Sequence, residues 1–302
     1  MALDTTSHDV YRGTDGVILP REISREIWAK TLQESAIMRM ARRIYLPGAG
    51  ITIPIITGDG IADVVNEAAE KPVSNPTFSN KTMTPVKIAM IQLFSNEFRR
   101  DLPRLYDALV DRAPRALTAK FDAMAMHGQS NPQGFDTLAN ATAVKIDNGG
   151  YDDVYANLVG AKGDVAAAGG MLDGWILAPQ AEATMLLAAD TVGRPIFINN
   201  ATTDGTINRL LGAPAYFNRA AYQAGADDTV GIAGDWSKAF YGIVDDITVK
   251  FSDQATVNDG TAQINLWQRN MFALLCEFEV GFAVEDDDYF VRLTQTAAGS
   301  ES

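Results

Sequence analysis

The stretch that decides the fold is FALLCEFEVGFAV, residues 272–284. Apolar side chains occupy every even position, whereas Glu277 and Glu279 occupy odd ones. Successive side chains of a β-strand point to opposite faces, so this period-2 pattern predicts a strand with one continuous apolar face. At ~3.3 Å per residue the strand spans roughly 43 Å, near or beyond the upper limit of ordinary strands.

A helix of similar length is predicted at residues 102–126. Its apolar residues recur at steps of three and four, which places them on one helix face: Leu102, Leu105, Leu109, Ala113, Leu117, Phe121 and Met124. At ~1.5 Å per residue this helix is roughly 37 Å long. A long helix beside an equally long strand predicts an elongated lobe. Residues 151–253, which alternate short helical and strand patterns, predict a compact mixed α/β lobe, so the fold class is α+β.

A long β-hairpin is predicted ahead of the helix. Residues 51–56 are rich in β-branched residues, Gly58-Asp59-Gly60 is typical of a turn, and residues 82–94 predict another strand. The tract between them is mostly polar. An isolated hairpin is only marginally stable in water, so we expect this one to rest on another molecule.

The first residues predict a short arm followed by a helical segment. Residues 1–16 are polar and lack periodicity, which is typical of a mobile arm. Pro20 favours a helix start, and the glycines at 48 and 50 favour its end. There is no signal-peptide core and no apolar run near the ~20 residues of a membrane span, so we expect synthesis in the cytoplasm.

The charge balance argues against a protein that binds DNA tightly. Acidic residues outnumber basic ones, 38 to 25, and the formal net charge is −13. Affinity for nucleic acid comes mainly from lysine and arginine, and no basic run offsets this excess. A protein surface that must not bind DNA is consistent with the same charge balance.

Residues suited to catalysis or metal binding are sparse. The two histidines, His8 and His127, are too few and too far apart for a zinc site. The run Asp286-Asp287-Asp288 lacks the spaced ligands of a calcium loop, so a solvated turn is favoured. Cys276 lies on the apolar strand face and is expected to be a buried, inert thiol. We expect neither an enzyme nor a cofactor.

Several stretches together resemble one known family. They follow one another in this order: FSNEF at 94–98 with Asp101, WILAP at 175–179, GRPIF at 193–197, LGAP at 211–214, GIAGDWSK at 231–238, residues 270–284 and residues 289–291. In order and spacing they resemble the major capsid proteins of tailed bacteriophages, which share the Hong Kong phage capsid fold. The resemblance covers residues 17–294.

The resemblance implies a division of the chain. The implied parts are an N-terminal arm (1–20), a first helical segment (21–47), an extended loop (48–85), a peripheral domain (86–145 with 262–296), an axial domain (146–261) and a tail (297–302). It also implies a non-enzymatic protein that self-assembles into pentamers and hexamers, which form an icosahedral shell around phage double-stranded DNA. An alternative is the shell protein of an encapsulin nanocompartment. Encapsulins bind cargo through an N-terminal helix, whereas here a polar arm precedes the first helix, which favours the phage reading.

Partners and contacts follow from the same resemblance. We expect a homo-oligomeric shell with a portal protein, a decoration protein and a separate scaffolding protein, unless the shell assembles unaided. The protein is expected in the virion after synthesis in the host bacterial cytoplasm. Candidate contacts between subunits are Glu67, Glu70, Lys71, Lys81, Arg99, Arg100 and Arg104. The two glutamates are expected to approach the three arginines of a neighbour, and the alternative is that all five are solvated.

One capsid of this family joins a loop lysine to an asparagine of a neighbouring subunit with the help of a buried carboxylate. The groups of these types here are the loop lysines Lys71 and Lys81 and, in the peripheral domain, Asn265, Asn270, Glu277 and Glu279. None of them matches the motif position by position, so we expect no covalent crosslink.

Overall fold

A computed structural model describes residues 35–58, 62–66, 71, 73–96, 103–148, 153–188, 209–258 and 262–297. The side chains of residues 103–114 and 246 are outside the description. The predicted N-terminal arm, the helix start at Pro20 and most of the tail also lie outside the described residues.

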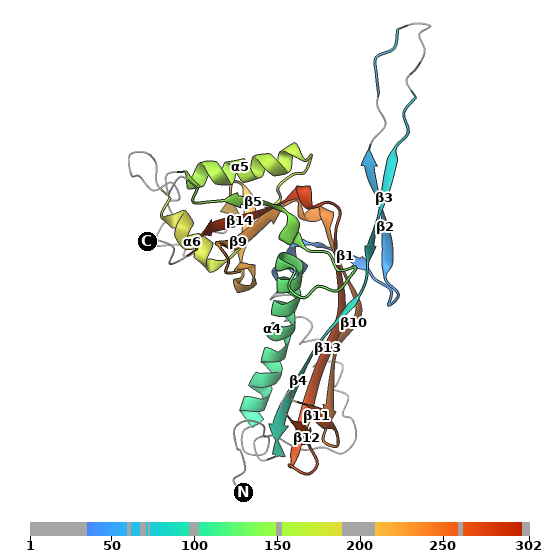
Figure 1. Ribbon diagram of the computed structural model, residues 1–302, viewed down its shortest axis with the longest axis vertical. Coiled ribbons are helices and arrows are strands. Elements are labelled where there is room, and N and C mark those ends of the chain that lie inside the picture. The colour runs from blue at the N-terminus through green and yellow to red at the C-terminus, as the bar shows by residue number, and fades with distance from the viewer. Residues whose placement is uncertain are drawn as a thin grey trace.

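One half of the molecule is elongated and is built on a four-stranded sheet (Figure 1). Its strands, in order across the sheet, are β1 (Arg42–Tyr45), β10 (Ala239–Ser252), β13 (Met271–Val284) and β4 (Val86–Ser95). The long helix α4 (Pro103–His127) runs beside this sheet. The strand predicted at 272–284 is therefore β13, and the helix predicted at 102–126 is α4.

The two faces of β13 are covered differently. Every side chain at an even position from 272 to 284 is at most 3% exposed. On this face Phe282 meets Phe121 of α4 edge to face, with ring centroids 6.4 Å apart. On the other face only the middle, at Leu275, Glu277 and Glu279, is partly open. Near its ends, separate apolar clusters cover Ala273 and Ala283.

The other half is a six-stranded mixed sheet with helices packed on it. The strands in order are β5 (Thr142–Lys145), β14 (Phe290–Thr296), β9 (Asp227–Gly234), β6 (Gly174–Leu177), β8 (Ala213–Phe217) and β7 (Arg209–Leu210). Helix α5 (Val154–Ala167) contacts β5, β9 and β14, and α6 (Pro179–Leu186) contacts β9. This sheet is the compact α/β lobe that the alternating pattern predicts.

The remaining elements are short. They are α2 (Ala36–Met40), the two-stranded β11 (Thr256–Asn258) and β12 (Gln263–Asn265), and the 3-10 turns η1 (Leu138–Asn140), η2 (Arg219–Ala221), η3 (Trp236–Lys238) and η4 (Asp287–Tyr289). Within the segment expected to be helical up to residue 47, β1 is a strand, which corrects that expectation. It pairs in parallel with β10, a contact that local periodicity does not reveal.

Strand pairing distributes the chain between the halves differently from the division implied by the resemblance. Strand β10 falls within the range 146–261 but pairs with β13 along most of its length. Strand β14 falls within 262–296 but lies between β5 and β9 in the six-stranded sheet. The chain thus passes between the halves twice near its end, because hydrogen-bond partners and not sequence neighbours decide which sheet a strand joins.

A two-stranded antiparallel hairpin, β2 (Ile51–Gly58) with β3 (Thr77–Met83), extends away from both sheets at the top of Figure 1. The strand expected to run from 82 to 94 is interrupted, since β3 ends at Met83 and β4 begins at Val86. Thr84 N–H donates to the carbonyl of Gly134 (2.9 Å), and Pro85 has no N–H to continue a ladder. The chain changes sheets at this point.

A buried carboxylate connects the two halves. Asp122 of α4 accepts hydrogen bonds from Ser35 Oγ (2.7 Å), Ala36 N–H (3.1 Å) and Asn218 Nδ2 (3.2 Å). Ser35 is also the N-cap of α2, and Asn218 follows β8 in the compact lobe. Burial raises the pKa of Asp122 from 3.8 to about 7, although these hydrogen bonds act in the opposite direction.

Candidate assembly surfaces

The hairpin carries apolar side chains that are exposed in the described part of the chain. Ile56 and Phe78 are cross-strand partners in the β2–β3 ladder, and they are 60% and 67% exposed. Beyond the paired region, Val64 is 94% and Val73 is 91% exposed. Because contiguous exposed apolar groups mark interaction surfaces in soluble proteins, the hairpin is the first candidate for contact between copies.

The root of the hairpin, in contrast, is anchored to the body. Met83 is fully buried beside Leu46 and Ala283. Lys81 Nζ lies 3.2 Å from Asp136 Oδ2, and the same carboxylate oxygen accepts from Val284 N–H of β13 (3.1 Å). The hairpin is therefore attached through an ion pair, whose acid is itself fixed to β13, and through a small apolar cluster.

The predicted contact residues have different outcomes. Lys81 is engaged within its own chain, as described above. Lys71 is exposed. Arg104 lies on α4, but its side chain is outside the description, and Glu67, Glu70, Arg99 and Arg100 lie outside the described residues. Their proposed pairing between subunits stays a prediction.

Sequence reasoning missed Ile56 and Phe78, because it treated the hairpin beyond its base as polar. A signal was present in the sequence. Ile55 and Ile56 are adjacent and so must point to opposite faces of the ribbon, which predicts at least one apolar side chain outside the cover of the body. In the structure Ile55 is buried and Ile56 is exposed.

The partly open middle of β13 carries a row of ion pairs. Lys87 of β4 lies 3.1 Å from Glu279, and Lys250 of β10 lies 3.0 Å from Glu277. These are two of the carboxylates that a lysine–asparagine crosslink could use as its acid. Such an acid works in an apolar pocket, whereas here each carboxylate is held by a lysine at a partly exposed surface.

The remaining titratable candidates have structural partners. His127 Nε2 lies 2.8 Å from the carbonyl of Ala220, and burial lowers its pKa. Cys276 is buried and burial raises its pKa to about 11, which keeps it a thiol and agrees with the inert role expected of it. Asp286 caps η4 by accepting from Asp288 N–H, so the aspartate run forms a turn. Within the described ranges, no three His, Cys, Asp or Glu side chains gather as metal ligands would.

None of the helices in the described part of the chain has both the length and the hydropathy that a bilayer span requires.

Comparison with known proteins gives consistent matches. The model of the phage capsid family matches residues 15–295. A probable major capsid protein, gp17 of Mycobacterium phage D29, is 29% identical across 93% of this chain and 91% of its own length. Its counterpart in Mycobacterium phage L5 is 28% identical across 94% and 91%. A solved structure from Gordonia phage Cozz superposes with a TM-score of 0.74 at 20% identity, covering 99% of this chain and 92% of that one.

Proposed function

This chain belongs to the phage capsid family, and we propose that it works as the major capsid protein of a phage head. Copies associate into pentamers and hexamers, which close into an icosahedral shell around double-stranded DNA. The four-stranded sheet with α4 forms the peripheral part of each subunit. The six-stranded sheet forms the axial part, which meets its symmetry mates at the centre of each capsomer.

The observation that carries this proposal is the projecting hairpin with its exposed Ile56–Phe78 pair. Two strands without a covering layer are marginally stable in water, and exposed apolar side chains gain free energy when another surface covers them. A neighbouring subunit supplies that surface in a shell. Stable protein contacts usually bury more than ~1,000 Å², so the contact requires the elongated body as well as the hairpin.

Charge pairs assist the same contact. Glu67 and Glu70 of the loop approach Arg99, Arg100 and Arg104 of the adjacent subunit. Each exposed pair contributes only ~0–1 kcal/mol, but every subunit of the shell repeats it. Reversing both glutamates to lysine impairs shell formation and leaves the unfolding temperature of the free subunit unchanged. Reversing Arg99 and Arg100 to glutamate in the same chain restores assembly, and shells unaffected by the first change would contradict the pairing.

The shell encloses the DNA but does not bind it tightly. The net charge of −13 repels phosphate, so packaged DNA remains free to move during packaging and ejection. The partners of such a wall are further copies of this chain, a portal protein, a separate scaffolding protein and a decoration protein. The chain is made in the cytoplasm of the bacterial host and ends in the virion, and it has no enzymatic role there.

Mature shells are held by non-covalent contacts. Lys81 forms an ion pair with Asp136 of its own chain. Glu277 and Glu279 likewise form ion pairs with Lys250 and Lys87 of their own chain. Boiled particles should give a single band near 32.6 kDa on a denaturing gel. A ladder of multimers that disappears on replacing Lys71 or Lys81 would contradict this.

Electron microscopy of the purified protein tests the proposed function. With scaffolding protein added if required, the wild-type chain forms closed particles or capsomer rings. The double variant Ile56→Ser/Phe78→Ser stays soluble and folded but forms neither. The matched control Ile56→Val/Phe78→Leu keeps the apolar surface and assembles. A wild-type chain that remains monomeric under all assembly conditions would refute the proposal.

A further inference from the structure

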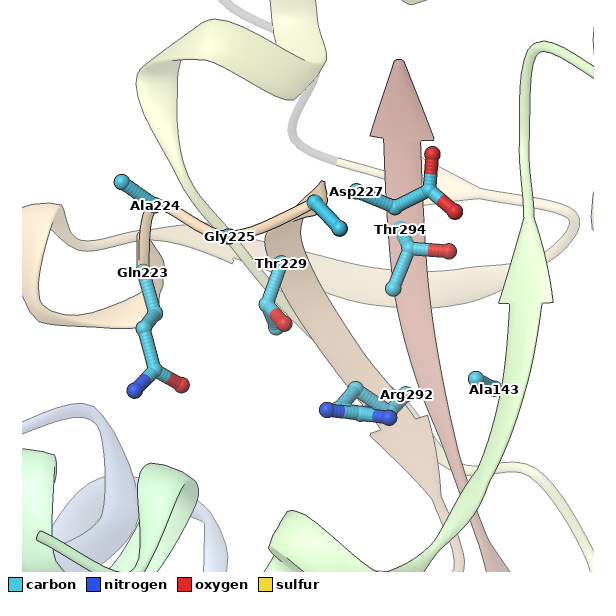
Figure 2. Close-up of a pocket in the computed structure, with 9 residues that line it drawn as sticks. Ala143, Gln223, Ala224, Gly225, Asp227, Thr229, Arg292 and Thr294 are labelled. Carbon is cyan, nitrogen blue, oxygen red and sulfur yellow. The ribbon is translucent and has the colours of Figure 1, made fainter. Parts of the chain in front are cut away.

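A polar pocket of about 430 Å³ opens on the compact lobe (Figure 2), and the strands β5, β9 and β14 that contribute to it lie away from the hairpin in Figure 1. Strands β5, β14 and β9 form one side of it, and the loop that precedes β9 forms the other. The residues that line the pocket are Ala143, Gln223, Ala224, Gly225, Ala226, Asp227, Thr229, Arg292 and Thr294.

Arg292 is the unusual member of this lining. It is partly buried within β14, and its Nε is fully buried without a hydrogen-bond partner. No carboxylate in the described part of the chain forms an ion pair with it. A guanidinium presents donors in a planar fork, and leaving a buried donor unpaired costs free energy. Because the buried Nε is out of reach of the pocket, the terminal N–H groups of this pocket-lining guanidinium are the ones available to an acceptor that the described part of the chain does not supply.

The acid at the rim does not supply that acceptor. Asp227 pairs with Lys145 through its Oδ1. In Figure 2 its carboxylate points away from Arg292, whereas the Gln223 amide and the Arg292 guanidinium lie on the same side of the pocket. Lys145 thus offsets the charge of Asp227, and Arg292 has no carboxylate partner among the described residues.

A change of strand register makes the rest of the wall polar. The β14–β9 ladder pairs Leu293 with Gly231 and then Thr294 with Thr229, so Val230 is passed over. This irregularity places a threonine opposite a threonine in the pocket wall. The facing loop is held by Asp228, which accepts from Tyr222 Oη (2.9 Å) and Gly225 N–H (3.1 Å). The pocket is therefore preformed and lined with hydrogen-bonding groups.

We propose that this pocket binds a carboxylate side chain, Asp or Glu, of a second copy of the chain, with Arg292 as its main partner. The inference rests on the proposed function, because shell assembly is what brings the second copy. A guanidinium group and a carboxylate group can form two parallel N–H···O hydrogen bonds, because their donors and acceptors are spaced alike. The chain offers 38 acidic residues for this role.

The pocket suits a carboxylate held by a protein better than a free one. Its apolar lining is limited to small alanines, so a free small acid gains little from burial there. A side chain already brought close by other contacts between subunits loses far less translational freedom on binding. The volume is also larger than a carboxylate group alone needs, which leaves room for the side chain that carries it.

The strand register provides a sharp test. Ala143 of β5 is the direct partner of Arg292 across the β5–β14 ladder, and it is exposed. The variant Ala143→Glu places an internal carboxylate beside the guanidinium and occupies the pocket. The variant Ala143→Gln fills the same volume without the charge and is the matched control. Arg292→Gln removes the charge directly, and Arg292→Lys keeps the charge but loses the planar fork.

We expect Ala143→Glu and Arg292→Gln to accelerate subunit loss from assembled particles by roughly tenfold or more, as loss of a buried charge partner does at interfaces. Ala143→Gln should dissociate more slowly than Ala143→Glu, and Arg292→Lys should fall between wild type and Arg292→Gln. The unfolding temperature of the free Ala143→Glu subunit should equal or exceed that of wild type, which excludes misfolding as the cause.

The outcomes separate this proposal from the proposed function. If wild-type chains form no particles, the proposed function is wrong. If particles form and all four variants dissociate at the wild-type rate, only the pocket proposal is overturned. N-acetylglutamate added to the free subunit probes for a free ligand: stabilisation that needs Arg292, with unaffected particles, would assign the pocket to a small acid instead. Stronger stabilisation by inorganic phosphate would overturn the choice of a carboxylate.

Discussion

The β2–β3 hairpin and the β10–β13–β4 sheet are both antiparallel and both carry large apolar side chains, yet they use them differently. In the sheet, Phe282 is fully buried against Phe121 of α4. In the hairpin, Phe78 is 67% exposed. The sheet has a helix of its own chain as a second layer, whereas no described helix lies on the hairpin in Figure 1. The sheet therefore stabilises the subunit, and the hairpin is the part that a neighbour completes.

The largest effect is expected from breaking the sheet side of this comparison. Phe282→Ala removes a ring that packs on Phe121 and Phe135 (centroids 6.4 and 6.1 Å away). We expect a loss of about 3–5 kcal/mol in the free energy of unfolding, because a cavity remains in a closely packed core. Urea denaturation of the free subunit measures this. A loss below about 1 kcal/mol would show that the helix does not cover the sheet as described.

The next effect concerns the joint between the sheet half and the compact lobe. The pKa of Asp122 is about 7 in the folded chain and lies above its ordinary value of 3.8, so the folded state holds a proton that the unfolded state releases. The stability it contributes is complete below about pH 4 and is lost as the pH rises to about 7. Acidification from pH 8 to 5 should therefore stabilise the free subunit through this group.

The variant Asp122→Asn isolates that contribution. An amide resembles the neutral acid in shape and charge, so the variant should lose the part of the pH dependence between 4 and 7. Denaturation at pH 5 and pH 8 measures the difference, with the exposed Asp164→Asn as the matched control. A wild-type pH slope in Asp122→Asn would mean that another group titrates in this window.

A smaller effect is expected at the hairpin root. Lys81→Met removes the partner of Asp136, while Val284 N–H still donates to that carboxylate. Both side chains are partly exposed, at 36% and 28%, so we expect a loss of about 1 kcal/mol or less. Thermal unfolding of the free subunit measures it, with Lys71→Met as a control. A larger loss would mean that the hairpin root contributes substantially to subunit stability.

The smallest effect on the free subunit is expected from Phe78→Ala, the hairpin counterpart of Phe282→Ala. An exposed side chain makes few contacts in the monomer, so the free energy of unfolding should change by less than about 0.5 kcal/mol. Assembly, measured by sedimentation, should nevertheless be impaired. Equal and large losses of monomer stability in the two variants would remove the distinction between the two regions.

The sequence by itself determined the elements whose periodicity is long and regular. The even-position run of 272–284 and the three- and four-residue steps of 102–126 predicted β13 and α4 within one residue at each end. Such patterns are reliable because a strand or helix with one apolar face must bury that face. The same run also indicated that Cys276 is buried. The order of short motifs further indicated the capsid family.

Only the tertiary structure decided which strands pair and which faces a second layer covers. Strand β10 joins the elongated sheet and β14 the compact one, although their positions in the sequence suggest the reverse. Ala283 is buried because Leu46 and Met83, distant in sequence, meet on the second face of β13. The Arg292 pocket needs β5, β9 and β14 side by side and a change of register that passes over Val230. Each of these depends on hydrogen-bond partners far apart along the chain, and local periodicity holds no information about that choice.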